Sequence, residues 1–429
     1  MAKPKVVIVG GGFGGLPCAR ALDGEPVEVV LLDERNYHLF TPLLYQVATA
    51  LLNPSDIAYP FRARFRRSRN VRFRQAQVTD VDLEAKRIRT QAGDEIPYDY
   101  LVLATGSTNN YFGNEELADA TIGMKTLEES LRLRNHVLSC LERASQEIDP
   151  EERKRWLTFV IVGGGPTGVE YAGALAELLK LVLGRDHPNL PPGSARIVLV
   201  EGLDRILSTF APRLGRYAER VLRKRGVEVK TGVLVQKATA DGALLSNGEQ
   251  IETRTIVWAA GVRPLEPAVK PEPPHSRSRR VEVDDHLRIP GAEGAFAIGD
   301  VAAARQNGEE LPLLSPVAMQ AGRYVARLIL DEAVPPALRA TRGPFRYVDK
   351  GTMATIGRNA AVGQIKGIRL TGFIGWIGWL LVHIYYLIGF RNRLVVLGSW
   401  AWNYLRHDRP IRIIARSDPD AVADALPPR

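Results

Sequence analysis

VVIVGGGFGG, at residues 6–15, is the stretch of sequence that decides the fold. Four β-branched residues run straight into glycines, as they do where a buried parallel strand turns sharply into a helix. Gly10 permits the tight turn, Gly12 lets the backbone approach a pyrophosphate, and Gly15 lets the new helix lie close to the sheet. Free N–H groups at the start of that helix attract phosphate. The stretch therefore predicts a dinucleotide-binding site.

Glycine-rich turns also occur without a ligand, so the residues that follow decide between the two interpretations. Ala19 and Leu22 come next at helical spacing, and VEVVLLDER at residues 27–35 supplies a second apolar strand. That strand ends at Asp33, 23 residues after Gly10, where the ribose of a dinucleotide needs a hydrogen-bond acceptor. This context favours the nucleotide site over an ordinary turn.

The opening pattern returns near the middle of the chain, at residues 156–184. An apolar strand again runs into glycines, which here are Gly163, Gly165 and Gly168. The next strand ends at Glu201, later than the usual spacing because residues 184–194 are inserted before it. Two such units imply two bound nucleotides. An acid at position 201 accepts a ribose 2′-hydroxyl and repels a 2′-phosphate, which favours NADH over NADPH.

The composition is that of a globular protein long enough for two or three domains: 429 residues, 45% hydrophobic and 24% charged. A formal net charge of +9 favours contact with an anionic partner, without choosing between phospholipid, nucleic acid and nucleotide. Cys18 and Cys140 are too few and too far apart for a disulfide framework, a redox pair or a zinc site, so we expect no metal site. The arginines of residues 62–72 lack aromatic residues placed for base stacking, so we expect a solvated or lipid-contacting face and no nucleic acid.

Other stretches extend the two predicted sheets. Alternation over residues 71–90 predicts strands of a small antiparallel layer. Residues 98–107 and 293–300 each predict a buried strand that ends in a glycine turn. The second of these strands places Asp300 at its carboxyl end, where ligands bind in parallel sheets. Between the first repeat and these strands, the proline-containing residues 36–62 predict an irregular excursion that lines a cavity.

The C-terminal region carries an uncharged run of 21 residues, 370–390. A helix of this length could span a bilayer, but its four glycines and His383 are costly in lipid. A helix buried in a soluble core would need a very large core to cover its tryptophans and tyrosines. An interfacial anchor is favoured, because aromatic residues cluster beside Arg391, Arg393, Arg406 and Arg409. The first core strand begins within six residues of the N-terminus, so we expect no cleaved signal peptide and a cytoplasmic catalytic face.

Nine stretches spread along the chain carry a specific resemblance. They are GGGFGG (10–15), DERNYHLFTPLLYQVATALL (33–52), LVLATGS (101–107), VGGGPTGVEYAGALAEL (162–178), TIVWAAGV (255–262), FAIGD (296–300), VAMQAGRYVA (317–326), GTMATIGRNAAV (351–362) and FRNRL (390–394). With them the chain resembles the type II NADH dehydrogenases, single-subunit NADH:quinone oxidoreductases that do not pump protons, within the two-dinucleotide-binding-domain flavoproteins. The resemblance implies an α/β fold with two Rossmann-like dinucleotide-binding domains, for FAD and NADH, plus a C-terminal membrane-associating region.

The resemblance also implies domain bounds and nucleotide ligands. The implied domains are residues 1–117 and 286–335 for FAD binding, 118–285 for NADH binding, and 336–429 for flavin-covering strands and membrane-anchoring helices. FAD would be bound by Gly10, Gly12, Phe13, Gly14 and Gly15 around the pyrophosphate, Asp33 or Glu34 at the ribose, Val78 at the adenine, Ala104, Thr105, Gly106 and Ala318 around the flavin, and Asp300 at the ribityl chain. NADH would be bound by Gly163, Gly165, Thr167, Gly168, Glu201 and Gly261.

Two residues are implied to take part in the reaction. Glu170 would lie close to where nicotinamide and flavin meet, with a part in proton or charge coupling. A buried glutamate without a partner is costly, which favours function over packing at this position. The family's quinone signature has two glutamines four residues apart; here Gln320 matches the second and Pro316 replaces the first. Which group would bond to a quinone carbonyl therefore stays open, as does a purely structural Gln320.

The implied reaction passes a hydride from NADH to FAD and two electrons on to a membrane quinone, ubiquinone or menaquinone. The implied partners are that quinone, a membrane lipid surface and, as one allowed assembly, a second copy of the chain in a homodimer. We expect a peripheral, monotopic protein on the cytoplasmic face of the cell membrane. Two alternatives remain: a soluble-type NADH-dependent reductase of an electron-carrier protein, and a membrane-docked nucleotide-sensing module without turnover. Disulfide reductases and sulfide:quinone oxidoreductases are disfavoured because they need cysteines beside the flavin.

Overall fold

The computed structural model describes residues 3–334, 341–406, 408–409 and 411–414, and the chain divides into two compact units. The first unit comprises Met1–Leu39, Ala58–Thr108 and Val262–Lys350. The second unit comprises Phe40–Ile57, Asn109–Gly261 and Gly351–Arg429. Each unit is assembled from three separate segments, so residues far apart in the sequence meet within it.

The compact units group some residues differently from the predicted domains. Residues 262–285, predicted with the NADH-binding domain, lie in the first unit, and residues 40–57, predicted with the FAD-binding domain, lie in the second. The predicted boundary at residues 335 and 336 lies outside the described residues. Because the predicted domains are defined by the nucleotide that each would bind, their bounds stay a prediction.

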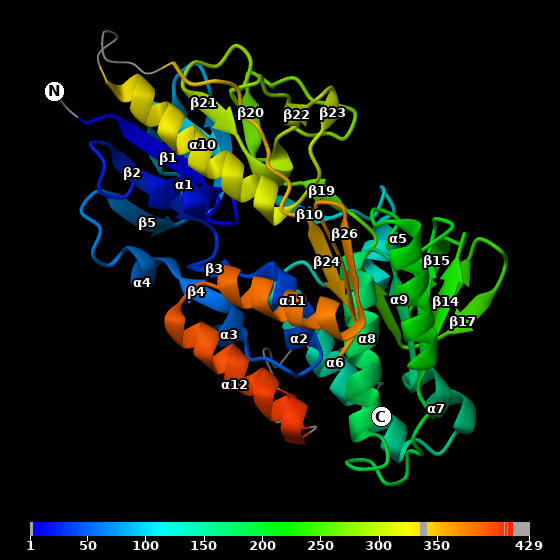
Figure 1. Ribbon diagram of the computed structural model, residues 1–429. Coiled ribbons are helices and arrows are strands. Elements are labelled where there is room, and N and C mark those ends of the chain that lie inside the picture. Colours follow the sequence, from blue (N-terminus) through cyan, green and yellow to red (C-terminus); the bar gives the residue numbers. More distant parts are fainter. Residues whose placement is uncertain (1–2, 335–340, 407, 410, 415–429) are drawn as a thin grey trace. The chain divides into compact units, whose positions relative to one another are not determined.

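A five-stranded sheet forms the centre of the first unit (Figure 1). Its strands lie in the order β21 (Ala295–Ala297), β9 (Tyr100–Leu103), β1 (Lys5–Val9), β2 (Glu28–Asp33) and β5 (Val71–Gln75). Every neighbouring pair is parallel. The chain thus begins at the middle of the sheet and winds first to one side and then to the other. Such doubly wound sheets bind ligands beyond the carboxyl ends of the strands, where the winding direction reverses.

Two helices of the first unit pack closely on each other, α1 (Gly15–Ala21) and α10 (Ser315–Ala333). The approach depends on Gly322, because a Cβ added there would clash with the carbonyl oxygen of Gly14. Pro316 lies in the first turn of α10, where a missing N–H costs nothing because the first N–H groups of a helix have no partner within it. The replacement of a glutamine at this position is therefore compatible with the helix.

A second sheet of the first unit has the order β20 (Ala268–Lys270), β6 (Val78–Asp82), β7 (Arg87–Thr90) and β8 (Glu95–Pro97). The predicted antiparallel layer is confirmed for β6 and β7. It is wrong for residues 71–75, because β5 pairs in parallel with β2 at the edge of the main sheet. In β5 the buried Val71 and Phe73 alternate with the exposed Arg72 and Arg74, so one face of the strand meets solvent and its sequence alternates as an antiparallel strand does.

Shorter elements complete the first unit. They are β3 (Tyr37–Leu39), β4 (Ala58–Pro60), α4 (Phe61–Phe65), β10 (Ser107–Asn109, of which the first two residues belong to this unit), β19 (Val262–Pro264), η2 (Gly299–Val301), β22 (Arg305–Gln306) and β23 (Glu309–Glu310). Strand β3 pairs with β4, β10 with β19, and β22 with β23.

The second unit repeats the same sheet. Its strands lie in the order β11 (Ile122–Gly123), β18 (Thr255–Trp258), β12 (Thr158–Val162), β13 (Arg196–Glu201) and β14 (Val227–Thr231), all in parallel. Val162 pairs with Val200 as Val9 pairs with Leu32, so each strand pair is followed directly by an acidic residue. The inserted residues 184–194 place β13 later in the sequence but do not change its pairing register with β12. The predicted internal repeat is confirmed.

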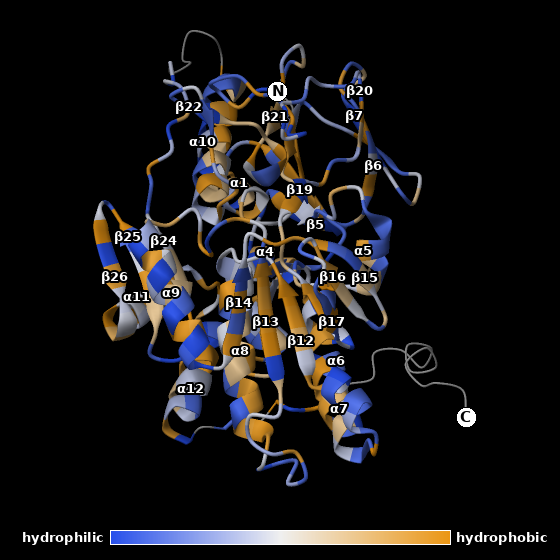
Figure 2. Ribbon diagram, turned by 90° about the vertical axis from the view of Figure 1, so that its right-hand side faces the viewer, coloured by the Kyte–Doolittle hydropathy of each residue, from blue (hydrophilic) through white to orange (hydrophobic). Residues whose placement is uncertain are grey.

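The helices of the second unit cover this sheet, whose strands β12 and β13 are coloured as strongly hydrophobic in Figure 2. The longer helices are α6 (Leu127–Gln146), α8 (Pro166–Val182) and α9 (Pro212–Lys224). Helix α6 starts with a capping box in which Thr126 and Glu129 bond to each other's backbone N–H. Helix α8 is buried over most of its surface, which explains its almost continuous apolar sequence. The short α2 (Leu44–Ala48) packs on both α6 and α8.

The remaining elements of the second unit before its C-terminal part are short. They are η1 (Thr41–Leu43), α3 (Pro54–Ile57), α5 (Glu115–Ala120), α7 (Pro150–Trp156), β15 (Val235–Thr239), β16 (Gly242–Leu245) and β17 (Gln250–Glu252). Strands β15 to β17 form an antiparallel sheet of their own.

The C-terminal part of the second unit consists of an antiparallel sheet and two helices. The sheet contains β24 (Thr352–Thr355), β25 (Ala361–Ile365) and β26 (Ile368–Thr371), and the helices are α11 (Gly372–Tyr386) and α12 (Phe390–Arg406). Strand β24 packs on α8, and α11 packs on all three strands. This part therefore joins the helix that follows the second glycine loop to the two C-terminal helices.

The uncharged C-terminal run does not form the single long helix that the spanning alternative requires. Helix α11 has 15 residues, which cover about 22 Å against about 30 Å of bilayer. The chain then breaks at Gly389, whose φ is +93°, before α12 begins. The buried-core alternative is wrong as well, because Gly375 and Trp379 are the only buried residues within α11. Among the described residues, no helix has the length and apolar character needed to cross a membrane.

Gly322→Ala and Gly398→Ala should change stability in opposite directions, although both glycines lie within helices. A Cβ at position 322 clashes with Gly14, so one of two packed helices must shift at a cost of about 1–3 kcal/mol. Gly398, in α12, has open space around its Cβ position, so alanine there should stabilise the helix by about 1 kcal/mol. Thermal unfolding measures both effects. A Gly322→Ala protein as stable as the wild type would contradict the close packing of α1 on α10.

Candidate functional site

The first glycine loop joins β1 to α1 and is tight at both of its ends. Gly10 has a φ of +99°, and a Cβ there would clash with the carbonyl oxygen of Ala104, just after β9. A Cβ at Gly15 would clash with the carbonyl oxygen of Gly10. Gly12, in contrast, has no heavy atom within 4 Å of its Cβ position. The loop is therefore open at the position where a backbone must approach a phosphate.

The second glycine loop, between β12 and α8, has the same geometry. Gly163 has a φ of +108°, and a Cβ there would lie 2.6 Å from the carbonyl oxygen of Ala259, just after β18. A Cβ at Gly168 would clash with Gly163, and Gly165 again has no atom within 4 Å. Each loop is thus a cradle that a side chain would fill. The residues present fit the pyrophosphates of two dinucleotides, one in each unit.

The two acids predicted at the first ribose are placed differently. Asp33 accepts hydrogen bonds from the backbone N–H of Gly11 at 2.6 Å and of Arg35 at 2.8 Å. Burial raises the pKa of Asp33, and these two hydrogen bonds oppose the rise. The Glu34 side chain is 44% exposed and pairs with Arg35 at 3.0 Å. Asp33, and not Glu34, therefore faces the glycine loop.

Glu201 has the corresponding contacts in the second unit. It accepts hydrogen bonds from the backbone N–H of Gly164 at 2.6 Å and of Leu203 at 2.8 Å. The other two residues predicted for the same nucleotide lie after strand ends of this sheet: Thr167 is exposed in the first turn of α8, and Gly261 follows β18 with a φ of +98°. The structure thus brings the Glu201 side chain into contact with the second glycine loop.

The residues predicted around the flavin lie after β9 and β21 of the first unit. The Thr105 hydroxyl donates a hydrogen bond to the carbonyl oxygen of Leu265, and the Ser107 hydroxyl donates one to Asp300. Gly106, between them, has a φ of +77°. Strands β9 and β21 are parallel neighbours in the sheet, so their carboxyl ends lie side by side.

Ala318 and Val78 complete the residues predicted in the first unit. Ala318 is buried near the start of α10, and its Cβ lies 3.2 Å from the Cβ position of Gly299. Its carbonyl oxygen lies 3.7 Å from the Cβ position of Gly14, so Ala318 belongs to the first loop's surroundings. Val78 begins β6 and packs, partly buried, against the core of the first unit.

His38, which the sequence did not single out, contacts the first loop. Its Nδ1 lies 2.9 Å from the carbonyl oxygen of Gly11, and its ring meets Phe13 edge-on with centroids 5.1 Å apart. Burial lowers the pKa of His38 to about 4, so the ring is neutral at pH 7. A carbonyl oxygen only accepts, so Nδ1 carries the proton. The histidine lies in a quoted stretch, 33–52, but no spacing rule indicated its contact.

Glu170 is buried in α8 and has partners that were not expected. Its Oε1 accepts hydrogen bonds from the backbone N–H of Thr355 at 3.1 Å and from the Trp379 indole at 3.2 Å. Burial raises the pKa of Glu170 to about 8, and the two hydrogen bonds oppose the rise. The expectation of a carboxylate without a partner is therefore wrong, because β24 and α11 supply two donors. The side chain is mostly protonated at pH 7.

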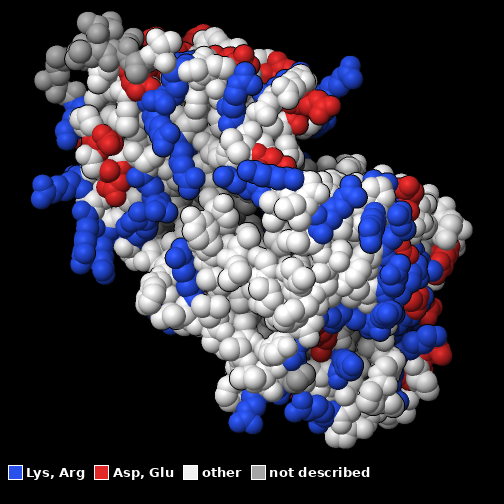
Figure 3. Space-filling view, viewed as in Figure 1, with Lys and Arg blue, Asp and Glu red and all other residues white. Residues whose placement is uncertain are grey.

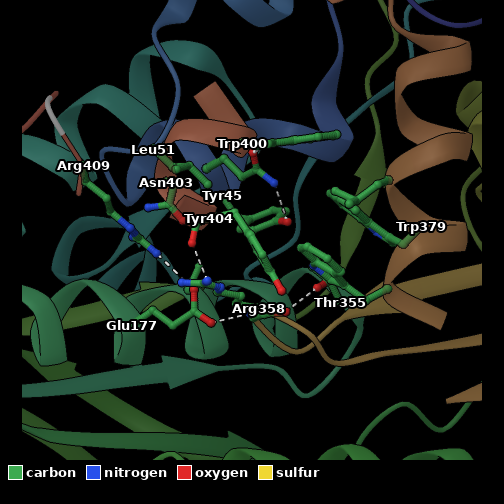
Figure 4. A pocket seen from close by; sticks show the side chains of 15 residues that line it. Tyr45, Leu51, Glu177, Thr355, Arg358, Trp379, Trp400, Asn403, Tyr404 and Arg409 are labelled. Carbon is green, nitrogen blue, oxygen red and sulfur yellow. Dashed lines mark hydrogen bonds and ion pairs between the residues drawn. The ribbon is translucent and has the colours of Figure 1, made fainter. Parts of the chain in front are cut away.

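A cavity of about 50 Å³ lies in the second unit and shares Thr355 and Trp379 with the surroundings of Glu170 (Figure 4). Tyr45 and Gln46 of α2 line it, which confirms the prediction that residues 36–62 contribute to a cavity wall. The Gln46 amide donates to the Tyr45 hydroxyl at 2.8 Å. The polar groups of this wall are therefore held in place by hydrogen bonds.

Gln320 is not a free polar group on the surface of α10. Its Nε2 donates to the carbonyl oxygen of Val348 at 2.9 Å, and its Oε1 accepts from the N–H of the same residue at 3.0 Å. Both ends of the amide thus pair with one backbone unit. Gln320 holds residues 347–349 against the first turns of α10 in the first unit.

Both cysteines are buried and are expected to be unreactive at neutral pH. Burial raises the pKa of Cys18 to about 12 and that of Cys140 to about 11. The thiolate is the reactive form, so neither side chain is placed for redox chemistry at neutral pH. The expectation that Cys18 faces the core is confirmed.

Comparison with known proteins gives one family for most of the chain. Residues 4–322 match the pyridine nucleotide-disulphide oxidoreductase family. The chain is 38% identical over 416 residues to the type II NADH:quinone oxidoreductase Ndh of Mycobacterium tuberculosis, covering 94% of this chain and 88% of that protein. It is 37% identical to NdhA, a second protein of that type in the same organism, over 95% of this chain and 88% of that one.

A solved structure has the same fold over nearly the whole chain. NDH2 from Plasmodium falciparum, in complex with NADH, superimposes with a TM-score of 0.86 at 20% identity. The superposition covers 95% of this chain and 99% of that one. At this identity the likeness concerns the fold alone.

Glu170→Gln should stabilise the protein increasingly as the pH rises. The folded-state pKa of Glu170 is about 8 against an ordinary 4.5, so between these values the folded protein keeps a proton that the unfolded chain has lost. The wild type's free energy of unfolding therefore falls over this range, by a few kcal/mol at most. Glutamine keeps an acceptor oxygen for Thr355 and Trp379 and cannot ionise.

Melting temperatures at pH 5, 6.5 and 8 measure the effect. The gap between Glu170→Gln and wild type should be small at pH 5 and largest at pH 8. Glu142→Gln, at an exposed position of α6, is the matched control and should leave the melting temperature nearly unchanged. A gap that is the same at every pH would contradict the raised pKa.

Proposed function

The chain belongs to the type II NADH:quinone oxidoreductase family, and on this premise we propose which of its residues carry the reaction. It is an enzyme that transfers a hydride from NADH to FAD and then two electrons to a quinone, without pumping protons. The flavin supplies the redox chemistry, so the chain's own residues bind, orient, exclude water and hold protons. The observation that supports the assignment best is the duplicated glycine loop. In both copies the middle glycine has open space at its Cβ position, and an acidic side chain accepts a hydrogen bond from a loop N–H.

We assign FAD to the first loop. The open space at Gly12 would let the pyrophosphate approach the backbone. Asp33 is assigned as the acceptor for the ribose in preference to Glu34, because Asp33 faces the loop while Glu34 pairs with Arg35 at the surface. Asp300, beside Ser107, would bind the ribityl chain, and Thr105 would flank the flavin. The predicted adenine contact of Val78 stays a proposal.

We assign NADH to the second loop. Gly165 gives the pyrophosphate its approach, and Glu201 would accept a ribose hydroxyl. Two backbone N–H groups already hold its carboxylate in place, so the charge cannot turn away from the site. A 2′-phosphate brought to the same place would be repelled, which supports NADH as the donor.

Glu170 would hold a proton for the reduction of quinone. Quinone reduction consumes two protons, while NADH delivers one hydride, so one further proton must come from the solvent through the protein. Burial keeps Glu170 largely protonated at neutral pH, and the donors from Thr355 and Trp379 fix its position. A carboxylic acid with a pKa near the working pH can both give and regain a proton.

Gln320 is a weaker candidate for direct contact with a quinone. Its amide is occupied at both ends by Val348, so bonding to a quinone carbonyl would require that pairing to open. Pro316 has no side-chain donor and cannot take over the role of the missing glutamine. Gln320 is better assigned to positioning the chain that follows α10, which a quinone would then contact.

The C-terminal helices form the surface that would dock on a membrane. Along α11, the apolar residues Ile374, Leu381 and Tyr385 are 71%, 67% and 71% exposed, and in α12 Leu394 and Leu405 are 53% and 75% exposed. Their spacings of four, seven and eleven residues put them on one side of each helix. Figure 3 shows few charged side chains over these helices, with basic side chains at the edges.

An apolar surface of this kind supports peripheral membrane binding, because water-exposed monomers rarely carry one. It also disfavours the alternative of a soluble reductase of an electron carrier. Exposed aromatic residues and arginines suit a helix lying in the headgroup layer. We place the docked face on the cytoplasmic side of the cell membrane. Ubiquinone or menaquinone as the acceptor, and a homodimer, stay predictions.

Glu201→Gln should lower the preference for NADH over NADPH at least tenfold, because the charge that repels the 2′-phosphate is removed. The measurement is kcat/KM for each nucleotide, with ubiquinone and menaquinone analogues as acceptors and the flavin content of each preparation determined. Asp33→Asn is the control in the first unit: it should reduce bound FAD and leave the nucleotide preference unchanged. A wild type that uses NADPH as well as NADH would overturn the role of Glu201.

Replacing Ile374 and Leu381 together by Asp should reduce binding to lipid vesicles at least tenfold, because two exposed apolar side chains that would enter the lipid are lost. Reduction of a long-chain quinone in vesicles should fall with it, while reduction of water-soluble ferricyanide persists. Ile148→Asp is the matched control, since Ile148 is 88% exposed in a loop outside α11 and α12. Vesicle binding that survives the double substitution would contradict the docking surface.

A further inference from the structure

The cavity of the second unit carries more positive charge than its carboxylate can balance. Arg358 and Arg409 both line it, together with Glu177 of α8 (Figure 4). Glu177 also pairs with Arg225 and accepts the backbone N–H of Arg358. Two guanidinium groups, those of Arg225 and Arg409, therefore share the Glu177 carboxylate, and the guanidinium of Arg358 has no carboxylate contact within the part of the chain that the structure describes. An unbalanced buried cation is costly, so the arrangement favours an anion.

The guanidinium groups still have donors to offer. Arg409 is 2% exposed and donates to the carbonyl oxygen of Thr49 at 2.7 Å and to Glu177 at 3.3 Å. Arg358 donates from one Nη to the carbonyl oxygen of Tyr404, and its buried Nε has no hydrogen-bond partner among the residues that the structure describes. Each guanidinium has five N–H groups. Several of them remain for a bound ligand.

Aromatic rings from the two C-terminal helices form another part of the wall. Trp376 and Trp379 come from α11, and Trp400 and Tyr404 come from α12. The Arg358 guanidinium lies over the Tyr404 ring, 4.1 Å from its centroid, which fixes its plane. The same helices carry the exposed apolar residues of the docking surface. Tryptophan and tyrosine prefer the level of lipid headgroups, where an apolar ring meets a polar edge.

We propose that this cavity binds the phosphodiester of a membrane phospholipid, with Arg358 as its principal ligand. Arginine offers a planar fork of donors that matches two phosphate oxygens, and the glycerol and acyl chains would pass along the apolar side of α11 or α12. A lipid is favoured over free phosphate because its glycerol and acyl chains would bury apolar surface against these helices, which phosphate alone lacks. The proposal rests on the membrane docking of the C-terminal helices and adds a specific lipid site to it.

The test is a titration of the purified flavin-bound enzyme with dihexanoyl phosphatidylglycerol below its micelle concentration, followed by tryptophan fluorescence and melting temperature. Wild type should bind saturably and melt higher as the lipid is added. Arg358→Gln should raise the Kd at least tenfold, and Arg358→Lys should restore part of the affinity because it keeps the charge. Arg369→Gln, at an exposed residue of β26, is the control and should bind as the wild type does. Flavin content and cooperative melting verify that each variant is folded.

Two further probes identify the source of the phosphate group. Inorganic phosphate that binds as tightly as the lipid would overturn the lipid assignment in favour of a free-anion site. Dihexanoylglycerol, which lacks phosphate, should bind far more weakly; equal binding would show an apolar groove only and overturn the role of Arg358. Unchanged lipid affinity in both Arg358 variants would do the same.

Failure of the docking surface would look different. In that case wild type would not bind vesicles and the paired aspartates at positions 374 and 381 would change nothing. The short-chain lipid, which needs no bilayer, would still bind in an Arg358-dependent way.

Discussion

Each nucleotide loop of this enzyme depends on one hydrogen bond between a carboxylate and a glycine N–H. Asp33 holds Gly11 and Glu201 holds Gly164, both at 2.6 Å. A buried N–H left without an acceptor would cost as much as a lost hydrogen bond, and the loop would be free to move. With the bond in place the next glycine stays open toward a phosphate. The same carboxylates present negative charge where a ribose would lie, so one interaction serves both loop geometry and nucleotide choice.

The C-terminal part of the second unit has two roles that meet at Glu170. Strand β24 and helix α11 supply the donors that position this carboxylate, and their packing removes it from water and raises its pKa. The outer sides of α11 and of α12 carry the apolar residues proposed to enter a membrane. A single short segment thus links the protonation of a buried acid to the surface that we propose as the membrane-docking face.

Charge follows the same division between surface and interior. Arginines lie at the edges of the apolar helices, while Arg358 and Arg409 lie beneath them in the cavity wall with Glu177. Burial makes the inner pair far more consequential than the outer residues, because exposed charges are screened by water and salt. The inner arginines therefore point to a specific anion, and the outer ones to general attraction toward an anionic surface.

Sequence by itself determined the two sheets, their repetition and the acids that close the loops. These features are local. Glycine spacing, runs of β-branched residues and an acid at the end of a strand constrain the backbone within a few dozen residues, so they can be recognised in the sequence alone. Glu201 could be recognised as the acid of the second unit even though residues 184–194 are inserted before its strand. The alternation of β5 gave a wrong prediction because this strand of a parallel sheet has one buried and one exposed face, as antiparallel strands commonly do.

Only the tertiary structure decided what surrounds Glu170, Gln320 and the cavity. The two donors to Glu170 lie 185 and 209 residues away in the chain, and the partner of Gln320 lies 28 residues away. No periodicity encodes such pairs, because they depend on which helix packs on which strand. The same is true of the 21-residue apolar run: its length allowed a spanning helix, and the break at Gly389 with the packing of α11 on β24 to β26 made it two short helices instead.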